Sequence, residues 1–248
     1  MDQAAYSALY SRLTKPDDYA ELAREYRITK ETVHVLHCQK IVREVKSRHS
    51  YVMQKAPEML ERWKRGETFL KLARHFDFPP ALTASIILRT DGYSRGHIQQ
   101  MMKEPSSIDK PRIRRELEEA LENELVYSPQ RLTEQVERGK RTENYIARWL
   151  DKRNAQYTTE AQAKEAGHQG KTPDFLLAHP IDFQGKKINW IECKGSFGDP
   201  KEIRINYRKQ LMHYLELFGY GVVLYWYGVV DGHQVKDVGI YEPSAFRD

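Results

Sequence analysis

Two acidic residues and one lysine stand in apolar surroundings within residues 171–196. Asp174 follows a proline, and Glu192 and Lys194 are separated by a single residue inside the run INWIECKG. Side chains two residues apart on an extended strand share a face, so Glu192 and Lys194 are predicted to point one way and Cys193 the other. Charged side chains are rarely buried unless they are paired or bind a metal, so the pattern requires a partner.

A hairpin is expected to bring the charged side chains together. The run DFQG at residues 182–185 predicts a turn that lets TPDFLLA fold back antiparallel beside INWIECK, so that Asp174 approaches Glu192. One interpretation is an ion pair between Lys194 and one carboxylate at the end of a sheet, which leaves the second carboxylate without a counter-charge. A divalent metal would provide a counter-charge for both carboxylates. Hard ions such as Mg²⁺ or Mn²⁺ take oxygen ligands, here Asp174, Glu192 and the carbonyl of Cys193.

The chemistry that suits such a site is hydrolysis of a phosphodiester bond. A bound metal lowers the pKa of its water. Lys194 can position or deprotonate that water and stabilise the negative charge that develops on the phosphate. The residue types and their spacing therefore predict a metal-dependent hydrolase with Asp174, Glu192 and Lys194 as catalytic residues.

The elements around these residues alternate between helix and strand. The run TENYIARWLDKRN predicts a helix with Thr142 as its N-cap, in which Glu143, Ile146 and Leu150 share one face, so that Glu143 is expected on the inward side. Strands are predicted at residues 155–160, 173–180, 187–195, 221–230 and 235–241. The run 221–230 is almost continuously apolar, which indicates a strand buried on both faces.

A second helix is predicted between the third and fourth of these strands. Pro200 opens it near its first turn and Gly219 closes it. Its inward stripe consists of Ile203, Tyr207, Gln210, Leu211, Tyr214 and Phe218. Gln210 has two interpretations, a site residue or a core glutamine bonded to a cap or to water. In either role the inward amide must be hydrogen-bonded.

The motifs resemble those of a known nuclease superfamily. Pro173-Asp174 and Glu192-x-Lys194, on the order helix, three strands, helix, strand, are similar to the PD-(D/E)xK nucleases. The runs KTPDFLL, INWIECKGSFGD and FGYGVVLYWYG resemble, more closely, the TPD family of that superfamily, which has animal and archaeal members. The resemblance implies a restriction-endonuclease-like α/β nuclease domain over residues 126–248.

The same resemblance implies site residues and a function. Glu143 resembles the extra acidic metal ligand of many members, and Gln210 is implied as a further catalytic residue. The implied activity is an Mg²⁺- or Mn²⁺-dependent endonuclease that hydrolyses phosphodiester bonds in DNA, with branched or junction DNA favoured over plain duplex. RNA stays open as a substrate. The alternative is a non-catalytic adaptor that keeps the nuclease fold and binds DNA or a protein partner. A homodimer is also expected, because many nucleases of this superfamily pair two subunits to cut both strands.

The first half of the chain is predicted to be helical. Residues 17–129 place apolar residues three and four apart, and no run there alternates like a strand. In two segments, 19–41 and 69–87, a Leu-Ala pair and an aromatic residue precede a short turn and a second helix, which resembles helix-turn-helix units. The sequence thus predicts an α+β chain with an all-α DNA-binding region at residues 1–125. A helical bundle without nucleic-acid contact is the alternative for this region.

The candidate contacts to nucleic acid lie on the side of the first candidate recognition helix that is expected to be exposed. They are Lys30, His34, His37, Lys40 and Arg43. Such side chains can meet phosphates. Residues 1–100 hold 17 Lys and Arg against 12 Asp and Glu, a surplus of 5 that equals the net charge of the whole chain. A basic first part suits a polyanionic partner.

Composition narrows the class of protein. The 248 residues are 40% hydrophobic and 30% charged, which is typical of a globular protein with one or two cores. Two cysteines, Cys38 and Cys193, are too few for a disulfide framework or a cysteine-based zinc site. No run approaches a membrane span and the N-terminus lacks the layout of a signal peptide. We therefore expect no membrane partner and an intracellular location, cytoplasmic in a prokaryote and nuclear or cytoplasmic in a eukaryote.

Overall fold

The chain divides by its internal packing into two compact units. The structure, a computed structural model, describes residues 1–232, 235 and 237–247. Residues 1–37 and 137–248 form the sheet unit, and residues 38–136 form the helical unit. The predicted boundary between residues 125 and 126 lies inside the helical unit and stays a prediction about function. None of the helices in the described part of the chain combines the length and apolar character needed to cross a membrane.

The sheet unit contains one mixed five-stranded sheet. Its strands, in spatial order, are β1 (Tyr157–Thr159), β2 (Phe175–Phe183), β3 (Lys186–Lys194), β4 (Gly221–Tyr225) and β5 (Val238–Tyr241). The pairs β1–β2 and β2–β3 are antiparallel, and the pairs β3–β4 and β4–β5 are parallel. Together with the helices, this sheet confirms an α+β chain. The strand predicted at 221–230 is shorter than expected, and the one predicted at 235–241 begins at Val238, with residue 236 outside the described residues.

The predicted hairpin is confirmed, and its turn has a clear local cause. Gln184 and Gly185 both have positive φ, at 50° and 76°, as two-residue hairpin turns require. Phe175 pairs with Ile191 across β2 and β3, which puts Asp174 at the level of Glu192.

A helical crossover links the parallel strands β3 and β4. It consists of α11 (Pro200–Asn206), a π-helical turn η3 (Tyr207–Leu211) and α12 (Met212–Phe218). Pro200 lies in the first turn, as predicted, and the Asp199 side chain caps the helix by accepting the N–H groups of Lys201 and Glu202, both at 2.9 Å. Gly219, with φ of 76°, follows the last turn.

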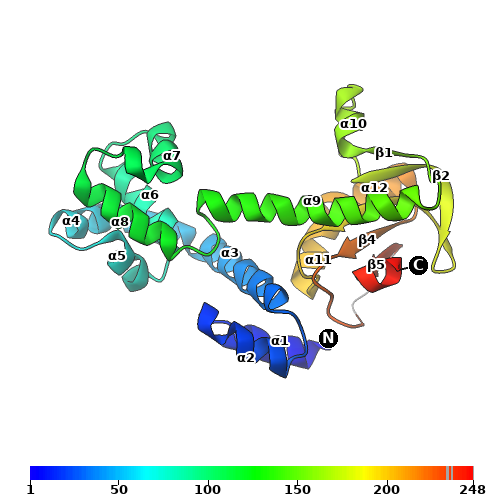
Figure 1. The fold of residues 1–248 in the computed structure, drawn as a ribbon, viewed down its shortest axis with the longest axis horizontal. Coiled ribbons are helices and arrows are strands. Elements are labelled where there is room, and N and C mark those ends of the chain that lie inside the picture. Colours follow the sequence, from blue (N-terminus) through cyan, green and yellow to red (C-terminus); the bar gives the residue numbers. More distant parts are fainter. Residues whose placement is uncertain (233–234, 236, 248) are drawn as a thin grey trace. The chain divides into compact units, whose positions relative to one another are not determined.

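Helices cover both faces of the sheet (Figure 1), so side chains on both faces of β3 meet a helix. On one face α9 (Pro129–Asp151) packs through Ile146, Trp149 and Leu150 onto Phe175, Ile191, Val222 and Leu224. On the other face the crossover packs through Ile203, Leu211 and Tyr214 onto Trp190, Val223 and Tyr225. The strand β4 is buried along its whole length, as predicted.

Gly221 is required for the packing of β4, and we predict a large loss of stability when it is replaced. A Cβ atom at this position would fall within the indole ring of Trp190, which is fully buried and donates its ring N–H to the Gly219 carbonyl. Gly221→Ala is therefore expected to lower the free energy of unfolding by about 3 kcal/mol and the Tm by several degrees.

The matched control for this substitution is Gly139→Ala. Gly139 lies within α9 in the same unit, and a Cβ there would meet nothing within 4 Å. Thermal unfolding followed by circular dichroism should give an equal or higher Tm for this variant, since alanine favours a helix over glycine. Equal Tm values for Gly221→Ala and the wild type would show that the packing of Trp190 against β4 is wrongly described.

Three helices of the first half belong to the sheet unit rather than to a separate bundle. They are α1 (Gln3–Arg12), which the sequence did not predict, α2 (Tyr19–Glu25) and the first part of α3 (Lys30–Gln54). Their buried residues, among them Leu9, Leu22, Val33 and Leu36, pack with Phe197, Tyr227 and Val230. The Tyr6 hydroxyl donates to the helix cap Asp199 at 3.0 Å. A fragment that starts at residue 126 would expose this cluster.

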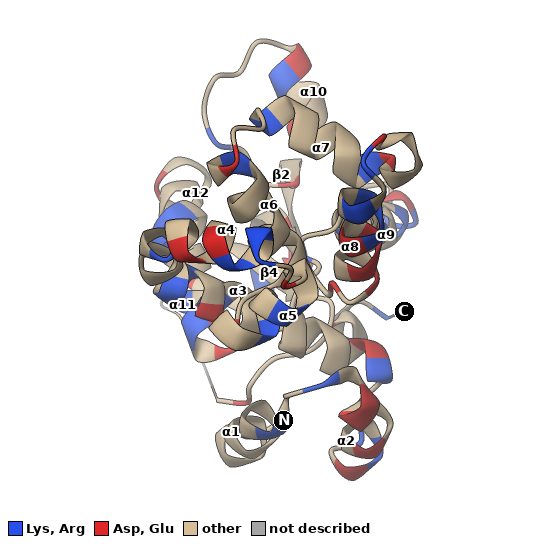
Figure 2. Ribbon diagram, turned by 90° about the vertical axis from the view of Figure 1, so that its left-hand side faces the viewer, with Lys and Arg blue, Asp and Glu red and all other residues tan. Residues whose placement is uncertain are grey.

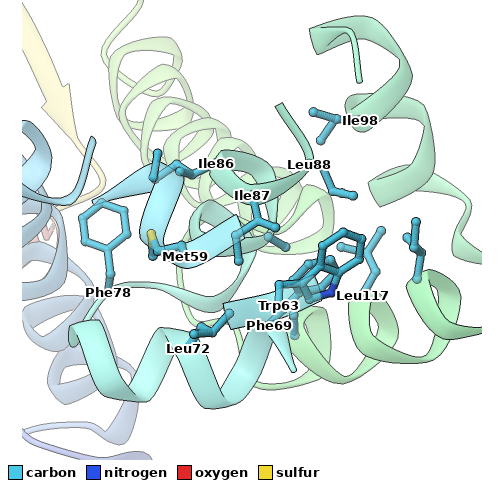
Figure 3. Packing of buried hydrophobic residues seen from close by; sticks show 14 of the residues in the cluster. Met59, Trp63, Phe69, Leu72, Phe78, Ile86, Ile87, Leu88, Ile98 and Leu117 are labelled. Atoms are coloured by element: carbon cyan, nitrogen blue, oxygen red, sulfur yellow. The ribbon is translucent and has the colours of Figure 1, made fainter. Parts of the chain in front are cut away.

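The helical unit has its own core. Besides the rest of α3 it contains α4 (Ala56–Lys64), α5 (Phe69–Phe76), α6 (Pro80–Thr90), α7 (Arg95–Lys103) and α8 (Pro111–Glu122). Figure 3 shows Met59, Trp63, Phe69 and Leu72 packed with Ile87, Leu88 and Leu117. Residues 17–129 are all described and contain no strand, as predicted.

The two segments that resemble helix-turn-helix units end their first helix in the same way. Arg27 and Asp77 adopt left-handed backbone with φ of 52° and 46°. The N–H of the next residue then returns to the alanine carbonyl of the Leu-Ala pair, in the bonds Ile28–Ala23 and Phe78–Ala73, both 3.0 Å. This closure satisfies helix-end carbonyls and turns the chain sharply into α3 or α6. Nucleic-acid binding by these segments stays a prediction.

Candidate functional site

Four predicted site residues meet where β3 ends. The Cys193 N–H donates to Asp174 Oδ2 at 2.6 Å, and the Asp174 N–H donates to Glu192 Oε2 at 3.3 Å. Lys194 Nζ donates to Glu192 Oε1 at 2.6 Å and to Gln210 Oε1 at 2.8 Å. Glu192 and Lys194 lie on the face covered by α11 and α12, and Cys193 packs with the α9 face, as the strand alternation predicts.

Burial controls the electrostatics of this group. The Glu192 side chain is 4% exposed and that of Lys194 18%. Burial raises the pKa of Asp174 well above its ordinary value, and the nearby charge of Glu192 raises it further, against the Cys193 N–H and Lys194. Burial also raises the pKa of Glu192, although Lys194 opposes the shift. Burial alone would lower the pKa of Lys194, but Glu192 outweighs it through its charge and hydrogen bond and leaves this pKa raised. The site thus holds two crowded carboxylates and one protonated amine.

The raised pKa of Asp174 predicts that Asp174→Asn stabilises the metal-free protein at neutral pH. Between the pKa of the unfolded chain, about 3.9, and the higher pKa of the folded chain, the folded state binds more protons, so stability falls as pH rises. Asparagine carries no charge and can still accept the Cys193 N–H. Thermal unfolding in EDTA should give a higher Tm for the variant at pH 7, by roughly 2–4 °C for each kcal/mol relieved.

The dependence of this gain on pH is its control. The difference in Tm should shrink as the pH falls and vanish well below about 3.9, the unfolded pKa, where Asp174 is protonated in both states. A gain that grew on acidification, or a lower Tm at pH 7, would contradict the crowding of the two carboxylates.

Gln210 reaches Lys194 from the π-helical turn. The Met212 N–H donates to the Tyr207 carbonyl five residues back, which shifts the side chains by one position relative to an α-helix. Gln210 is half-buried, and its side-chain oxygen is bonded to the Lys194 amine. The predicted inward stripe is confirmed, whereas the sequence did not predict the π turn that carries Gln210.

Sequence reasoning missed the anchors of the loop that precedes Asp174. The Tyr214 hydroxyl donates to the Thr172 carbonyl at 2.9 Å, and Lys171 Nζ donates to the Lys209 carbonyl at 2.7 Å. Burial, followed by the charges of Glu192 and Asp174, raises the pKa of Tyr214. A tyrosine in an otherwise apolar stripe needs a partner for its hydroxyl, and this was the available signal.

Glu143 does not join the group as predicted. Its side chain is exposed, so the expectation that it lies on the inward side of α9 is wrong, while its role as a metal ligand stays a prediction. The charge of Glu143 still contributes to the raised pKa of Asp174, so it lies near the rim of the site. The predicted N-cap at Thr142 is also wrong: α9 begins at Pro129, and the buried Thr142 hydroxyl donates to the Arg138 carbonyl at 3.0 Å.

The oxygen donors of this group suit a hard divalent ion. Asp174 and Glu192 approach one another, and each carboxylate oxygen has lone pairs beyond those used in the hydrogen bonds above. A cation would offset the burial that raises both pKa values, and the charge of Glu192 that raises the pKa of Asp174 further. Across the described residues, no three His, Cys, Asp or Glu side chains cluster tightly enough for a metal site. The set therefore offers two carboxylates, with the Cys193 carbonyl as the predicted third ligand.

The residues predicted to contact nucleic acid differ in how far their side chains are buried. Lys30 is exposed, His34, Lys40 and Arg43 are half-buried, and His37 is buried at 5% exposure. His37 Nδ1 lies 2.7 Å from the Tyr19 hydroxyl. The expectation that His37 lies on an exposed side is wrong, because that side of α3 packs against α2. Phosphate contact by the others stays a prediction.

Comparison with known proteins gives the same family over the region of the site. The family model described as "Protein of unknown function TPD sequence-motif" matches residues 109–241, more than half of the chain. The mouse protein named CDAN1-interacting nuclease 1 is 33% identical over 172 residues, which cover 65% of this chain and 59% of the mouse protein. The cattle and human proteins of the same name are 32% and 31% identical over 170 residues, with the same coverage of both chains.

Two further findings limit what the relatives imply. The chain spans about 59% of the length of these curated relatives. No solved structure gives a significant match to it. The family match includes Thr172-Pro173-Asp174 as well as Glu192 and Lys194. The chain belongs to the TPD family.

Proposed function

We propose that this chain is a metal-dependent nuclease that hydrolyses phosphodiester bonds in DNA. The observation that carries the proposal is the meeting of Asp174, Glu192 and Lys194, with Gln210 bonded to the lysine. Relatives named as nucleases support the same class of activity. In this proposal the sheet unit is a PD-(D/E)xK nuclease core, in which the end of β3 and the residues before β2 form the catalytic edge.

Each residue has a separate role in the proposed reaction. Asp174 and Glu192 would hold Mg²⁺ or Mn²⁺, with the Cys193 carbonyl as a further oxygen ligand. When bound, such an ion supplies the charge that polarises the phosphoryl group and lowers the pKa of a water molecule. The Cys193 N–H orients the Asp174 carboxylate through its 2.6 Å hydrogen bond. Glu143, at the rim, would act only through its charge.

Lys194 acts in this proposal as a cation. Its raised pKa keeps the amine protonated at neutral pH, which favours stabilisation of phosphate charge and the orientation of water over removal of a proton. Glu192 and Gln210 hold the amine at 2.6 and 2.8 Å, so its direction is fixed before substrate binds. Of the two roles expected from the sequence, the geometry favours the electrostatic one.

Partners and substrate structure are part of the proposal. The relatives' name reports an interaction with CDAN1, and we extend to this chain only the coarser proposal of a protein partner. The alternative of a non-catalytic adaptor keeps the same fold, but the intact set of Asp174, Glu192 and Lys194 favours catalysis. Branched or junction DNA is the proposed substrate, and RNA is the competing one.

The experiment that tests the proposal is incubation of the purified chain with a panel of labelled nucleic acids. Linear duplex, flap, fork and junction DNA and a single-stranded RNA are each incubated with Mn²⁺, with Mg²⁺ or with EDTA. The expected result is cleavage of a DNA substrate that requires the metal. Binding without cleavage of any substrate would favour the adaptor, and cleavage of RNA alone would replace the proposed substrate class.

A further inference from the structure

The crossover between β3 and β4 carries a row of exposed cations on its solvent side. They are Lys201, Arg204 and Arg208, spaced three and four residues apart, with Lys209 beside them and Lys171 bonded to the Lys209 carbonyl. We call these five residues the basic stripe. Figure 2 shows blue segments along α11. Within the described part of the chain, no member of the stripe lies within 4.0 Å of a carboxylate.

The acidic residues of the same crossover do not neutralise the stripe. Glu202 is half-buried and accepts from the Asn206 side chain at 3.5 Å. Glu216 is exposed, but it lies about two turns beyond Arg208 on α12. Four cations therefore extend over about 12 Å of helix, from Lys201 to Lys209, at a rise of about 1.5 Å per residue. Cations that are left without counter-charges on a rigid helix suit a polyanion.

The basic stripe is continuous with the candidate site. Arg208 and Lys209 directly precede Gln210, whose side chain turns inward to bond Lys194 at 2.8 Å. Lys171 stands three residues before Asp174 and ties the loop of that carboxylate to the stripe. A polyanion that follows the stripe would therefore pass beside the carboxylates of the site.

We propose that the basic stripe binds the phosphate backbone of the nucleic-acid substrate and guides it to the site at the end of β3. The proposal rests on the nuclease function proposed above, and it assigns substrate binding to the crossover between β3 and β4 in addition to the predicted contacts on α3. Arg204 and Arg208 are the strongest candidates, because a guanidinium offers paired N–H donors that match phosphate oxygens.

The test compares two double substitutions with the same loss of charge. Arg204→Gln with Arg208→Gln removes the centre of the stripe. Lys186→Gln with Lys187→Gln is the control, since these exposed lysines lie at the other end of β3, about 23 to 26 Å from Lys194 at about 3.3 Å per residue. Binding of a fluorescent DNA duplex by the full chain is measured by anisotropy in EDTA, between about 50 and 200 mM salt. Circular dichroism and Tm confirm that both variants are folded.

The expected result is a shallower salt dependence for the arginine variant alone. Each lost phosphate contact removes about 0.9 from the slope of log affinity against log salt, so two contacts remove about 1.8 and lower the affinity roughly 10-fold or more at 0.1 M salt. The lysine variant should retain the slope of the wild type.

The outcomes separate this inference from the proposed activity. If the wild type cleaves DNA with metal and the arginine variant keeps the wild-type slope, the stripe is not a phosphate-binding surface, while the nuclease function stands. If the wild type binds DNA through the stripe but cleaves nothing, the nuclease function fails and the stripe stands. Equal losses of DNA affinity in both variants, or absence of any DNA binding, would contradict the proposal that the basic stripe binds phosphate.

Discussion

Asp174→Asn is expected to lower the rate of metal-dependent cleavage by about 1,000-fold or more. Groups that stabilise charge at a reacting centre typically contribute at least about 100- to 1,000-fold, and Asp174 would also hold the ion that supplies this charge. Asparagine has nearly the same shape and can still accept the Cys193 N–H, so the loop and β3 should keep their geometry. Single-turnover cleavage at saturating enzyme is the measurement.

The same variant is expected to be more stable than the wild type in EDTA, because burial and then the charge of Glu192 raise the pKa of Asp174. Loss of activity together with a gain of stability is typical of a residue retained for function rather than for folding. Substitution of a residue that merely supports the fold would lower both activity and stability.

A matched control for this prediction lies on β2, the strand that follows Asp174. Asp182 is an exposed carboxylate near the hairpin end of β2, so Asp182→Asn removes an equal charge away from the site. It should leave both the cleavage rate and the Tm close to the wild type. Cleavage by Asp174→Asn at the wild-type rate would remove this residue from the catalytic set.

Lys194→Ala is expected to slow cleavage by about 100-fold or more while leaving metal binding in place. The loss is of the size typical of one acid–base or electrostatic group. A cation does not ligate a cation, so metal affinity should stay equal or rise once the positive charge is gone. Single-turnover cleavage and calorimetric titration with Mn²⁺, measured on the same preparation, separate the two quantities.

Two further variants test the geometry around Lys194. Lys194→Arg should restore little activity, because a guanidinium differs in shape from the amine that Glu192 and Gln210 hold at 2.6 and 2.8 Å. Lys187→Ala, on the same strand, is the control and should cleave normally. If Lys194→Ala cleaved at the wild-type rate, the lysine would be only the counter-charge of Glu192, which is the ion-pair interpretation of the sequence.

The hairpin that unites the site could be predicted because its determinants are local. The two-residue period of a strand fixes that Glu192 and Lys194 share a face, and the turn at Gln184 and Gly185 makes the two strands antiparallel. The exact level of Asp174 could not be predicted, because a register shift between Leu176 and Ile181 brings it to Glu192. Likewise, the backbone preferences of Pro200 and Gly219 set where the crossover helix begins and ends. The turn, the shared face of Glu192 and Lys194 and the limits of the crossover helix needed no knowledge of the rest of the fold.

The errors arise where a helix face depends on what packs against it. The period of α3 places His34 and His37 near one another, but only the packing of α2 decides that His37 is buried. On α9, the period groups Glu143 with Ile146. In the structure Ile146 is buried in the core, whereas Glu143 is exposed at the edge of the buried stripe. Helix periodicity defines a stripe and does not say how far burial extends at its edge.

Other features depend on contacts that are distant in sequence. The π turn shifts Gln210 into register with Lys194, and nothing in the run YRKQL predicts it. The packing of α1 depends on Tyr6 reaching Asp199, nearly two hundred residues away. Tertiary contacts of this kind decide which unit an amphipathic helix joins, so the N-terminal helices could be recognised as helices but not assigned to the sheet unit.

The central claim is that Asp174 and Glu192 hold a divalent ion that catalysis requires. The most direct measurement is the single-turnover rate of cleavage of a labelled DNA as a function of Mn²⁺ concentration, for the wild type and for Asp174→Asn. We expect no cleavage in EDTA, a rate that rises and saturates with Mn²⁺ in the wild type, and a loss of about 1,000-fold in the variant at every concentration. Cleavage that persists in EDTA, or equal rates for the two proteins, would contradict the central claim.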